Sequence, residues 1–187
     1  IEHGYAVRRA LRSAHPFMSS EEDMVVGELG PDTLWNEALR NIDSVVHLAA
    51  RTHVIRDIAA DPLAEYRRIN VDGTRALVKA AGAAGVRRFV FLSSIKVNGE
   101  ETGERPFTEH DTPQPQDAYG ISKREAELAL AKSAAGTGME TVVLRPPLIY
   151  GPGVKGNFLK LMRAIDRGVP LPLGSIRNRR SLLYVDH

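Results

Sequence analysis

The chain has 187 residues, 43% of them hydrophobic and 26% charged, which is the composition of an ordinary globular domain with a sizeable core. A formal net charge of +2 gives no strong field for nucleic acid, and no apolar run reaches the ~20 residues of a membrane span, so we expect neither partner. Without cysteine the chain has no disulfide or thiolate metal site, and its six His residues show no metal-ligand spacing.

Helical and strand patterns alternate along the chain, which predicts an α/β fold: a Rossmann-like, doubly wound parallel sheet with helices on both faces. The polar segment 98–116 is predicted to be a functional loop, because loops of this length in compact domains usually are. In chain order, the other predicted elements are a strand over 5–11, a strand over 24–27, a helix over 31–40, a buried strand over 43–48, a helix over 62–84 closed by Gly85, a strand over 88–92, a helix over 117–135, a strand over 141–145, a helix over 157–167 and a strand over 181–185.

Tyr119 and Lys123 form the most informative local pattern in the chain. They are four residues apart on a predicted helix with Asp117 as its N-cap, so their polar ends share one face. An ammonium beside a phenol stabilises the phenolate, and we expect it to lower the Tyr119 pKa from about 10 toward neutrality, as a general base requires. A hydroxyl from another strand, such as Ser94, would then hydrogen-bond the substrate oxygen. The spacing alone does not exclude an accidental pair.

Six short motifs follow one another along nearly the whole chain. They are Gly27-Glu28-Leu29, His47-Leu48-Ala49-Ala50, Asn70-Val71-Asp72-Gly73-Thr74, Leu92-Ser93-Ser94, Tyr119-Gly120-Ile121-Ser122-Lys123, and the run from Arg145 to Gly153. Each is weak alone. In this order and at this spacing, the set resembles the extended short-chain dehydrogenase/reductases, in the NAD-dependent epimerase/dehydratase branch that acts on nucleotide sugars.

The resemblance implies two parts: an NAD(P)-binding Rossmann-like domain over 1–150 and the beginning of a substrate-binding region over 151–187. A dinucleotide-binding fold places its first strand at the centre of the sheet, with a Gly-rich phosphate loop directly after it. The sequence contains no G-x-x-G-x-x-G and opens with residues that look like the end of a first helix. We therefore expect the first strand and the Gly-rich loop to be absent from this chain.

The resemblance also implies a catalytic set of Ser94, Tyr119 and Lys123. Tyr119 would take a proton from a sugar hydroxyl, and Lys123 would hold the phenolate and bind the nicotinamide ribose. Ser94 would orient the reacting oxygen. The neighbouring Ser93 should point to the opposite side of its strand, so Ser94 is the better candidate.

NAD is the expected cofactor, bound outside the carboxyl ends of the strands. Glu28 and Leu29 resemble the family's acidic–apolar pair at the adenine. Small residues such as Ala49 and Ala50 let a dinucleotide approach the backbone, and tight helix–sheet packing explains them nearly as well. Arg12 stands where an acidic residue would favour NAD, so NADP stays an alternative. The complete expected cofactor set is Arg12, Glu28, Leu29, Leu48, Ala49, Ala50, Asn70, Tyr119, Lys123 and Pro146, with Asn70 largely structural.

The expected substrate is a nucleotide sugar, with UDP as the nucleotide. Arg180 resembles a family Arg that grips the diphosphate, for which a guanidinium is well suited, and Asn157 at a helix start resembles another diphosphate contact. A solvated basic loop around Arg180 remains open. Lys96 and Asn98 depart from the family pattern Ser-Ala-x-Val-Tyr-Gly and could meet a hexosamine or a keto-sugar beside Ser94.

The expected function is an NAD(P)-dependent nucleotide-sugar 4-epimerase of the UDP-glucose or UDP-N-acetylhexosamine type, acting by transient oxidation at C4. One alternative is a nucleotide-sugar 4-keto reductase of deoxy-sugar biosynthesis. Another is a non-catalytic NAD(P)-sensing protein on the same fold, although the intact catalytic set speaks against it. A dehydratase is disfavoured because that class carries Asp-Glu where this chain has Ile95-Lys96. We further expect a cytoplasmic homodimer.

Overall fold

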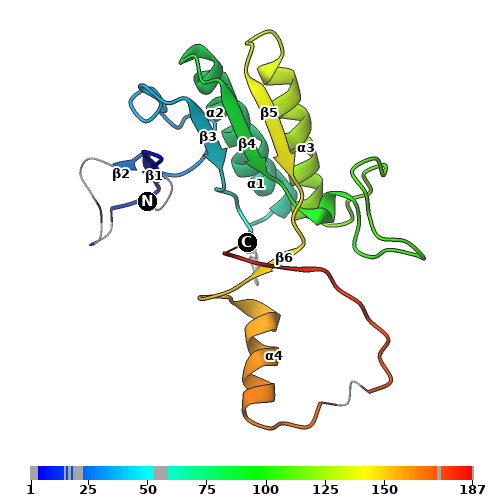
Figure 1. Ribbon diagram of the computed structural model, residues 1–187. Helices are drawn as coiled ribbons and strands as arrows, with labels where there is room; N and C mark the ends of the chain where they lie inside the picture. Colours follow the sequence, from blue (N-terminus) through cyan, green and yellow to red (C-terminus); the bar gives the residue numbers. More distant parts are fainter. Residues whose placement is uncertain are drawn as a thin grey trace. The chain divides into compact units, whose positions relative to one another are not determined.

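The computed structural model describes residues 4–14, 16, 18, 23–52, 59–171 and 174–186. By its internal contacts the chain divides into two compact units, Ile1–Arg145 and Pro146–His187. Figure 1 labels the elements of both units.

The first unit contains two parallel sheets (Figure 1). The larger sheet has β4 (Arg88–Leu92) between β3 (Ser44–His47) and β5 (Glu140–Leu144), and the smaller one pairs β1 (Arg9–Leu11) with β2 (Asp23–Val25). The predicted parallel α/β fold is therefore confirmed. Among the described residues no strand pairs with both sheets, and the separation falls where a dinucleotide-binding sheet has its first strand.

The helix predicted over 62–84 is present but is not uniform. It consists of α1 (Pro62–Tyr66), a π-helical stretch η1 (Arg67–Asp72) and α2 (Gly73–Ala83). Asp61 caps its start, since the carboxylate accepts a hydrogen bond from the Ala64 backbone N–H at 3.0 Å. Gly85 follows the end with a φ of 76°, the left-handed conformation that terminates many helices at a glycine.

The helix that carries Tyr119 and Lys123 is α3 (Ala118–Ala134). Asp117 is its N-cap, as predicted, because Oδ1 accepts a hydrogen bond from the Gly120 backbone N–H at 2.6 Å. A short 3₁₀ turn, η2 (Ile95–Val97), follows β4 and contacts α3. Ser94 caps this turn, so the serine hydroxyl is fixed between the end of a strand and the start of a turn.

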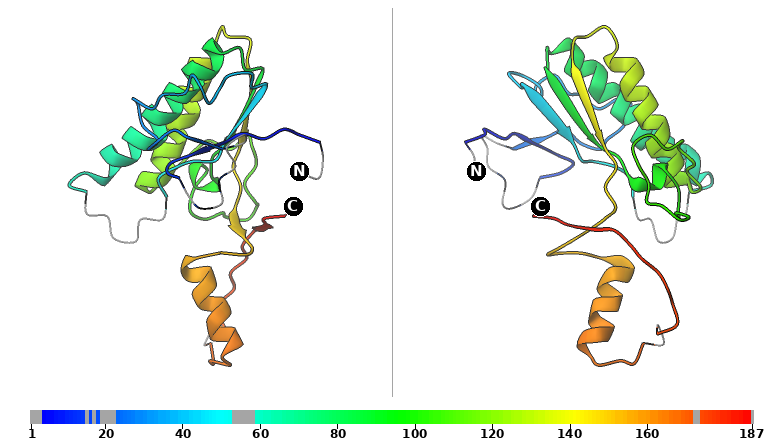
Figure 2. Two further views of the ribbon diagram at one scale, coloured as in Figure 1. Left: turned by 90° about the vertical axis from the view of Figure 1, so that its left-hand side faces the viewer. Right: turned by 45° about the vertical axis from the view of Figure 1, so that its right-hand side comes forward.

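The core of the first unit lies between the larger sheet and its helices, which cover one face of the sheet (Figure 2). Phe89 and Phe91 of β4 point into this core and are fully buried, each contributing about 1.5–3 kcal/mol to folding. Strand side chains alternate, so Val46 lies on the other face and is 60% exposed. No helix of the described residues in this unit covers that face, so helices on both faces are not seen in this part of the chain.

Two local predictions are wrong. Residues 31–40 form turns in place of a helix. Thr33 explains this, because its hydroxyl accepts from the Gly30 N–H at 2.9 Å and donates to the Glu28 carbonyl at 2.7 Å, bonds that compete with a helical start. The strand predicted to be buried over 43–48 is also largely open, since Leu48 is 63% exposed.

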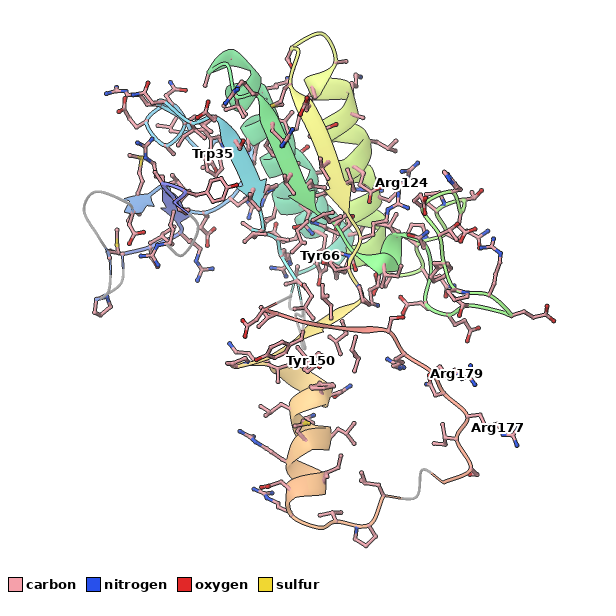
Figure 3. The ribbon with its side chains drawn as sticks, in the orientation of Figure 1. Trp35, Tyr66, Arg124, Tyr150, Arg177 and Arg179 are labelled. Carbon is pink, nitrogen blue, oxygen red and sulfur yellow. The ribbon has the colours of Figure 1, made fainter. Side chains whose placement is uncertain are left out.

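The second unit contains β6 (Leu148–Tyr150), α4 (Gly156–Asp166) and β7 (Leu182–Tyr184), with β6 and β7 paired in parallel. The sequence patterns did not predict β6. The Tyr150 ring is the centre of an aromatic cluster, 5.3 Å from the Phe158 ring and 5.4 Å from the Tyr184 ring between centroids (Figure 3). Within the described ranges, no helix is both long and apolar enough to cross a membrane.

Candidate active site

Three polar side chains follow one another at four-residue spacing along α3: Tyr119, Lys123 and Glu127. This spacing places them on one side of the helix, as predicted for the first two. The Lys123 side chain is only 2% exposed, and its Nζ lies 4.0 Å from the centre of the Phe91 ring in β4. The ammonium therefore contacts the face of an aromatic ring in the core, a favourable cation–π arrangement.

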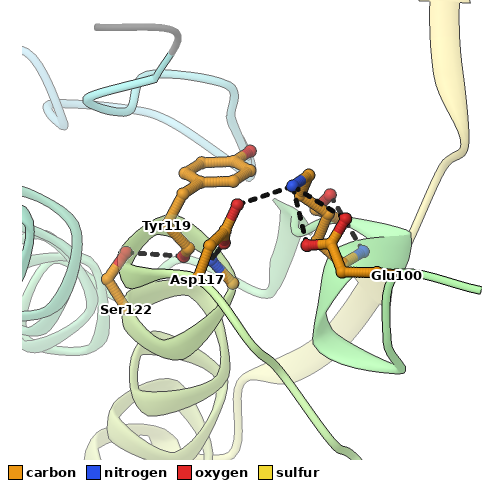
Figure 4. A network of polar contacts seen from close by, with 7 residues as sticks. Glu100, Asp117, Tyr119 and Ser122 are labelled. Carbon is orange, nitrogen blue, oxygen red and sulfur yellow. Dashed lines mark hydrogen bonds and ion pairs between the residues drawn. The ribbon is translucent and has the colours of Figure 1, made fainter. Parts of the chain in front are cut away.

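The Tyr119 phenol lies near the hydroxyls of Thr52 and Ser94, and both hydroxyls act to lower its pKa. Its ring meets the Tyr66 ring edge-on, with 6.3 Å between centroids. The Tyr119 carbonyl accepts a hydrogen bond from the Ser122 hydroxyl at 2.8 Å (Figure 4). The structure thus brings Ser94 and Tyr119 together, from segments 25 positions apart in the sequence.

The predicted lowering of the Tyr119 pKa is wrong for this arrangement. Burial raises the pKa of Tyr119 above its usual value of 10, and the nearby hydroxyls of Thr52 and Ser94 only partly oppose this effect. Burial also lowers the pKa of Lys123 to about 7, although the charge of Glu127 acts in the opposite direction. The physical reason is desolvation, which disfavours a phenolate and an ammonium alike.

His47, at the end of β3, is a neutral core histidine. Its side chain is buried, and Nε2 lies 3.0 Å from the Thr74 hydroxyl. Burial and then the nearby Lys123 charge lower its pKa to about 3. The imidazole ring also stacks on Phe91 at 5.6 Å between centroids, so it packs as part of the core.

Asn70 ties the segment after β3 to α3. Its Oδ1 accepts from the Arg51 backbone N–H at 2.8 Å, and its Nδ2 donates to the Arg51 carbonyl at 3.1 Å and to the Ser122 hydroxyl at 2.9 Å. The side chain is 1% exposed. This geometry supports the structural role expected for Asn70.

Residues after β1, β2 and β3 surround a cavity of about 390 Å³. Trp35 also lines it, lies beside β3 (Figure 3), and carries a buried indole N–H with no hydrogen-bond partner among the described residues. Leu48, which is exposed, is not among the residues that line this cavity, and Pro146 belongs to the second unit, so the cofactor role of both stays a prediction. The five expected cofactor residues in the cavity wall are Arg12, Glu28, Leu29, Ala49 and Ala50.

Lys96 and Asn98, expected at the substrate, have different surroundings. Lys96 Nζ donates to Asp117 Oδ2 at 2.5 Å and to Glu100 Oε1 at 2.8 Å (Figure 4). Burial lowers its pKa, but these carboxylates raise it more, so the net pKa is raised. Asn98 is buried, and Nδ2 donates to the Thr108 carbonyl at 3.3 Å. Lys96 is thus close to the start of α3, and Asn98 is turned into the protein.

Asn157 and Arg180 lie in the second unit. Asn157 is the second residue of α4, and Arg180 comes shortly before β7; both are exposed. Arg177 and Arg179 extend from the same segment before β7 (Figure 3). The basic segment is therefore accessible to solvent within its own unit.

Sequence reasoning missed four residues around the site: Thr52, Trp35, Glu127 and Arg145. Glu127 carried a signal, since it continues the four-residue spacing of Tyr119 and Lys123 and is an acidic residue on a buried helix face. Thr52 carried none, because it lies in a segment with no periodic pattern.

A parallel α/β fold with a cavity at the carboxyl ends of its strands, and a Tyr–Lys pair beside a strand-end serine, defines a dinucleotide-binding protein of the short-chain dehydrogenase/reductase class. The family model for the NAD dependent epimerase/dehydratase family matches residues 1–187, and the chain belongs to this family.

Named relatives agree with this assignment. The chain is 44% identical to a UDP-glucose 4-epimerase of Vibrio cholerae over 191 residues, covering 100% of this chain and 57% of that protein. It is 32% identical over 162 residues to the N-acetyl-alpha-D-glucosaminyl-diphospho-ditrans,octacis-undecaprenol 4-epimerase of Escherichia coli O157:H7, covering 86% of this chain and 47% of that protein. The chain therefore spans about half the length of these relatives.

Solved structures share the fold. A dTDP-glucose 4,6-dehydratase of Streptomyces venezuelae, with NAD bound, superposes with a TM-score of 0.73 at 28% identity, covering 91% of this chain and 53% of that one. A UDP-glucuronic acid 4-epimerase of Bacillus cereus, in complex with UDP-glucuronic acid and NAD, gives a TM-score of 0.69 at 27% identity, covering 83% of this chain and 49% of that one.

Proposed function

We propose that this protein is an NAD-dependent nucleotide-sugar 4-epimerase of the UDP-glucose or UDP-N-acetylhexosamine type, with Tyr119 as the base. The observation that carries the proposal is the position of the Tyr119 phenol beside the Ser94 hydroxyl, one helical turn from the buried Lys123. The 44% identity to a UDP-glucose 4-epimerase supports an epimerase over the other reactions of the family.

The residues of the site have distinct roles in this proposal. Bound NAD would supply the reversible oxidation of the sugar at C4. Tyr119 takes the proton of the 4-hydroxyl at its phenol oxygen, and Ser94 hydrogen-bonds the same reacting oxygen. Lys123 must be protonated to stabilise the phenolate. Burial raises the pKa of Tyr119 and lowers that of Lys123, so the phenolate and the ammonium each depend on the partners that surround them.

The cavity of the first unit fits the adenosine part of NAD. Leu29, Ala49 and Ala50 offer apolar and small surfaces for a flat ring, and Trp35 adds an aromatic side chain to the cavity wall. Arg12 lines the same cavity and is suited to a phosphate, so NADP remains the alternative cofactor.

The second unit supplies the proposed contacts to the sugar nucleotide. Asn157 at the start of α4 and Arg180 are suited to the diphosphate. The substrates named for the relatives differ in their nucleotide or lipid, but all of them contain a sugar diphosphate. This shared group supports the proposal that Asn157 and Arg180 of the second unit bind the diphosphate. Lys96 could reach the sugar itself only by exchanging a carboxylate partner.

Turnover of UDP-sugars with and without added NAD(P)H tests the proposal. An epimerase converts UDP-glucose to its C4 epimer with no net consumption of cofactor. A 4-keto reductase consumes NAD(P)H in proportion to product, and a cofactor sensor turns over nothing; either result would end the epimerase assignment. The cytoplasmic location and the homodimer remain predictions, to be tested by cell fractionation and by light scattering of the purified protein.

A further inference from the structure

Glu127 is a buried carboxylate at the centre of a polar cluster. It is 6% exposed and accepts a hydrogen bond from the Ser93 hydroxyl at 2.6 Å. Arg145 approaches it with two nitrogens, Nε at 2.8 Å and Nη2 at 2.7 Å, and Arg124 donates at 3.2 Å. Burial alone would raise the pKa of Glu127, but these hydrogen bonds lower it by more than burial raises it. The net pKa is lowered, so the carboxylate is ionised at neutral pH.

The cluster joins the segments that carry the catalytic groups. Ser93 directly precedes Ser94, and its backbone N–H donates to the Leu144 carbonyl of β5 at 2.7 Å. Arg145 follows β5 and also donates to Asn98 Oδ1, just beyond the η2 turn, at 3.1 Å. Glu127 therefore holds the ends of β4 and β5 against the helix that carries Tyr119.

Glu127 also acts on Lys123, one helical turn before it. The Phe91 ring of β4 and the neutral His47 of β3 lie near Lys123, while Tyr119 and Glu127 stand one turn before and after it on its own helix. His47 is uncharged and Phe91 carries no formal charge, so Glu127 provides the negative charge that opposes the loss of the Lys123 proton. Arg124 and Arg145 pair with the same carboxylate, while Glu127 still acts to raise the Lys123 pKa.

We propose that Glu127 is a positioning residue for the reaction: it fixes the strand end at Ser94 through Ser93, and its negative charge keeps Lys123 protonated beside Tyr119. This inference rests on the proposed function, because it assigns Glu127 a role in sustaining the base. A purely structural Glu127 would hold the same segments together but would have no influence on the titration of Lys123.

The test is the pH dependence of kcat for Glu127→Gln in the NAD-loaded enzyme. Removing the negative charge lowers the Lys123 pKa, so Lys123 loses its proton at lower pH. The basic limb of the profile should therefore move to lower pH by about one unit. Ser93→Ala is the matched control, since it removes one hydrogen bond and keeps the charge; its kcat should fall with the basic limb in the wild-type position. A uniform loss in Glu127→Gln with an unmoved limb would overturn the proposal.

A second measurement does not depend on turnover. The ¹³Cε chemical shift of Lys123 reports its pKa by NMR in wild type and Glu127→Gln, and equal values in the two proteins would refute the coupling. If no sugar nucleotide is turned over, this titration still tests Glu127, so failure of the proposed function is distinguishable. If Glu127→Gln does not fold, Arg124→Gln replaces it as the test, because Arg124 is a partly exposed partner of Glu127. Removing this positive charge leaves the Glu127 charge less neutralised, so we expect the Lys123 pKa to rise. An unchanged Lys123 pKa would contradict the proposal.

Discussion

For single residues, the environment of the Tyr119–Lys123 pair sets the conditions under which it can work. Both groups are pushed toward their neutral forms, Tyr119 by a raised pKa and Lys123 by a pKa of about 7. A base in such a site needs fixed partners that recover part of the lost hydration. The hydroxyls of Thr52 and Ser94 supply this at the phenol, and Glu127 supplies it at the ammonium.

Replacing Tyr119 by Phe removes the proton acceptor while the ring keeps its contact with Tyr66. We expect kcat for epimerisation to fall about 10²-fold or more, the usual scale for loss of a general base. The urea midpoint should change little. Tyr66→Phe is the control, since it removes a hydroxyl from the neighbouring ring and should leave kcat close to wild type. Wild-type activity in Tyr119→Phe would exclude this residue as the base.

At the scale of elements, the start of α3 and the η2 turn are packed directly against each other. A Cβ added to Gly120 would lie 2.8 Å from the Lys96 carbonyl oxygen, so the helix and the turn are in direct contact there. Asp117 serves both elements, with one carboxylate oxygen capping α3 and the other paired with Lys96. The relative position of Ser94 and Tyr119 therefore depends on this short stretch of contact.

Two variants of Asp117 separate its two roles. Asp117→Asn keeps a capping side chain and loses only a partly exposed ion pair, so its free energy of unfolding should fall by about 0–1 kcal/mol. Asp117→Ala loses the cap as well and should be less stable than Asp117→Asn by about 1 kcal/mol. Urea unfolding of both variants measures the difference. Equal stabilities would mean that the cap contributes nothing.

Sequence patterns correctly predicted the helices whose first residues include a capping side chain. The helices over 62–84 and 117–135 begin at Asp61 and Asp117, and both caps form. The helix predicted over 31–40 was wrong because Thr33 competes for the backbone, and β6 was missed because three residues show no period. Within the site, spacing and family motifs brought forward Ser94, Tyr119 and Lys123. They did not give the direction of the Tyr119 pKa, because burial depends on segments distant in the sequence.

The role of Glu127 also could not be predicted from the sequence, because it depends on distant segments. Its spacing from Lys123 was visible in the sequence, but its meaning depends on Ser93 and Arg145, which reach it from the ends of two different strands. Nothing local to α3 indicates that these ends converge there. The Thr52 contact with Tyr119 likewise requires the folded arrangement of β3 and α3.

At the scale of the whole molecule, the buried neutral His47 couples stability to pH. Its pKa is about 3 in the folded protein and about 6.5 in an unfolded chain, so between these values only the unfolded state binds the proton. Stability should therefore be lost as pH falls from about 6.5 toward 3, by on the order of a few kcal/mol. Above pH 6.5 this group has no effect on stability.

His47→Gln keeps a polar group for Thr74 and removes the titration. Urea unfolding at pH 8 measures the intrinsic effect of the substitution, and unfolding at pH 5 and pH 4 measures the pH dependence. We expect the variant to lose less stability than wild type between pH 8 and pH 4. Parallel losses in the two proteins would show that other groups cause the acid sensitivity.

The π-helical stretch η1 has a consequence for how this chain can change over time. Its wider turn lets Asn70 reach Arg51 and Ser122 while the following α2 keeps Leu77 and Val78 in the core. A π-helical turn holds one residue more than an α-helical turn, so deleting one residue from η1 would restore an ordinary helix and leave α1 and α2 close to their present faces. The wide turn itself would be lost, and with it the place from which Asn70 bridges Arg51 and Ser122. The extra residue of η1 therefore serves the Asn70 contacts, and the packing of α2 does not depend on it.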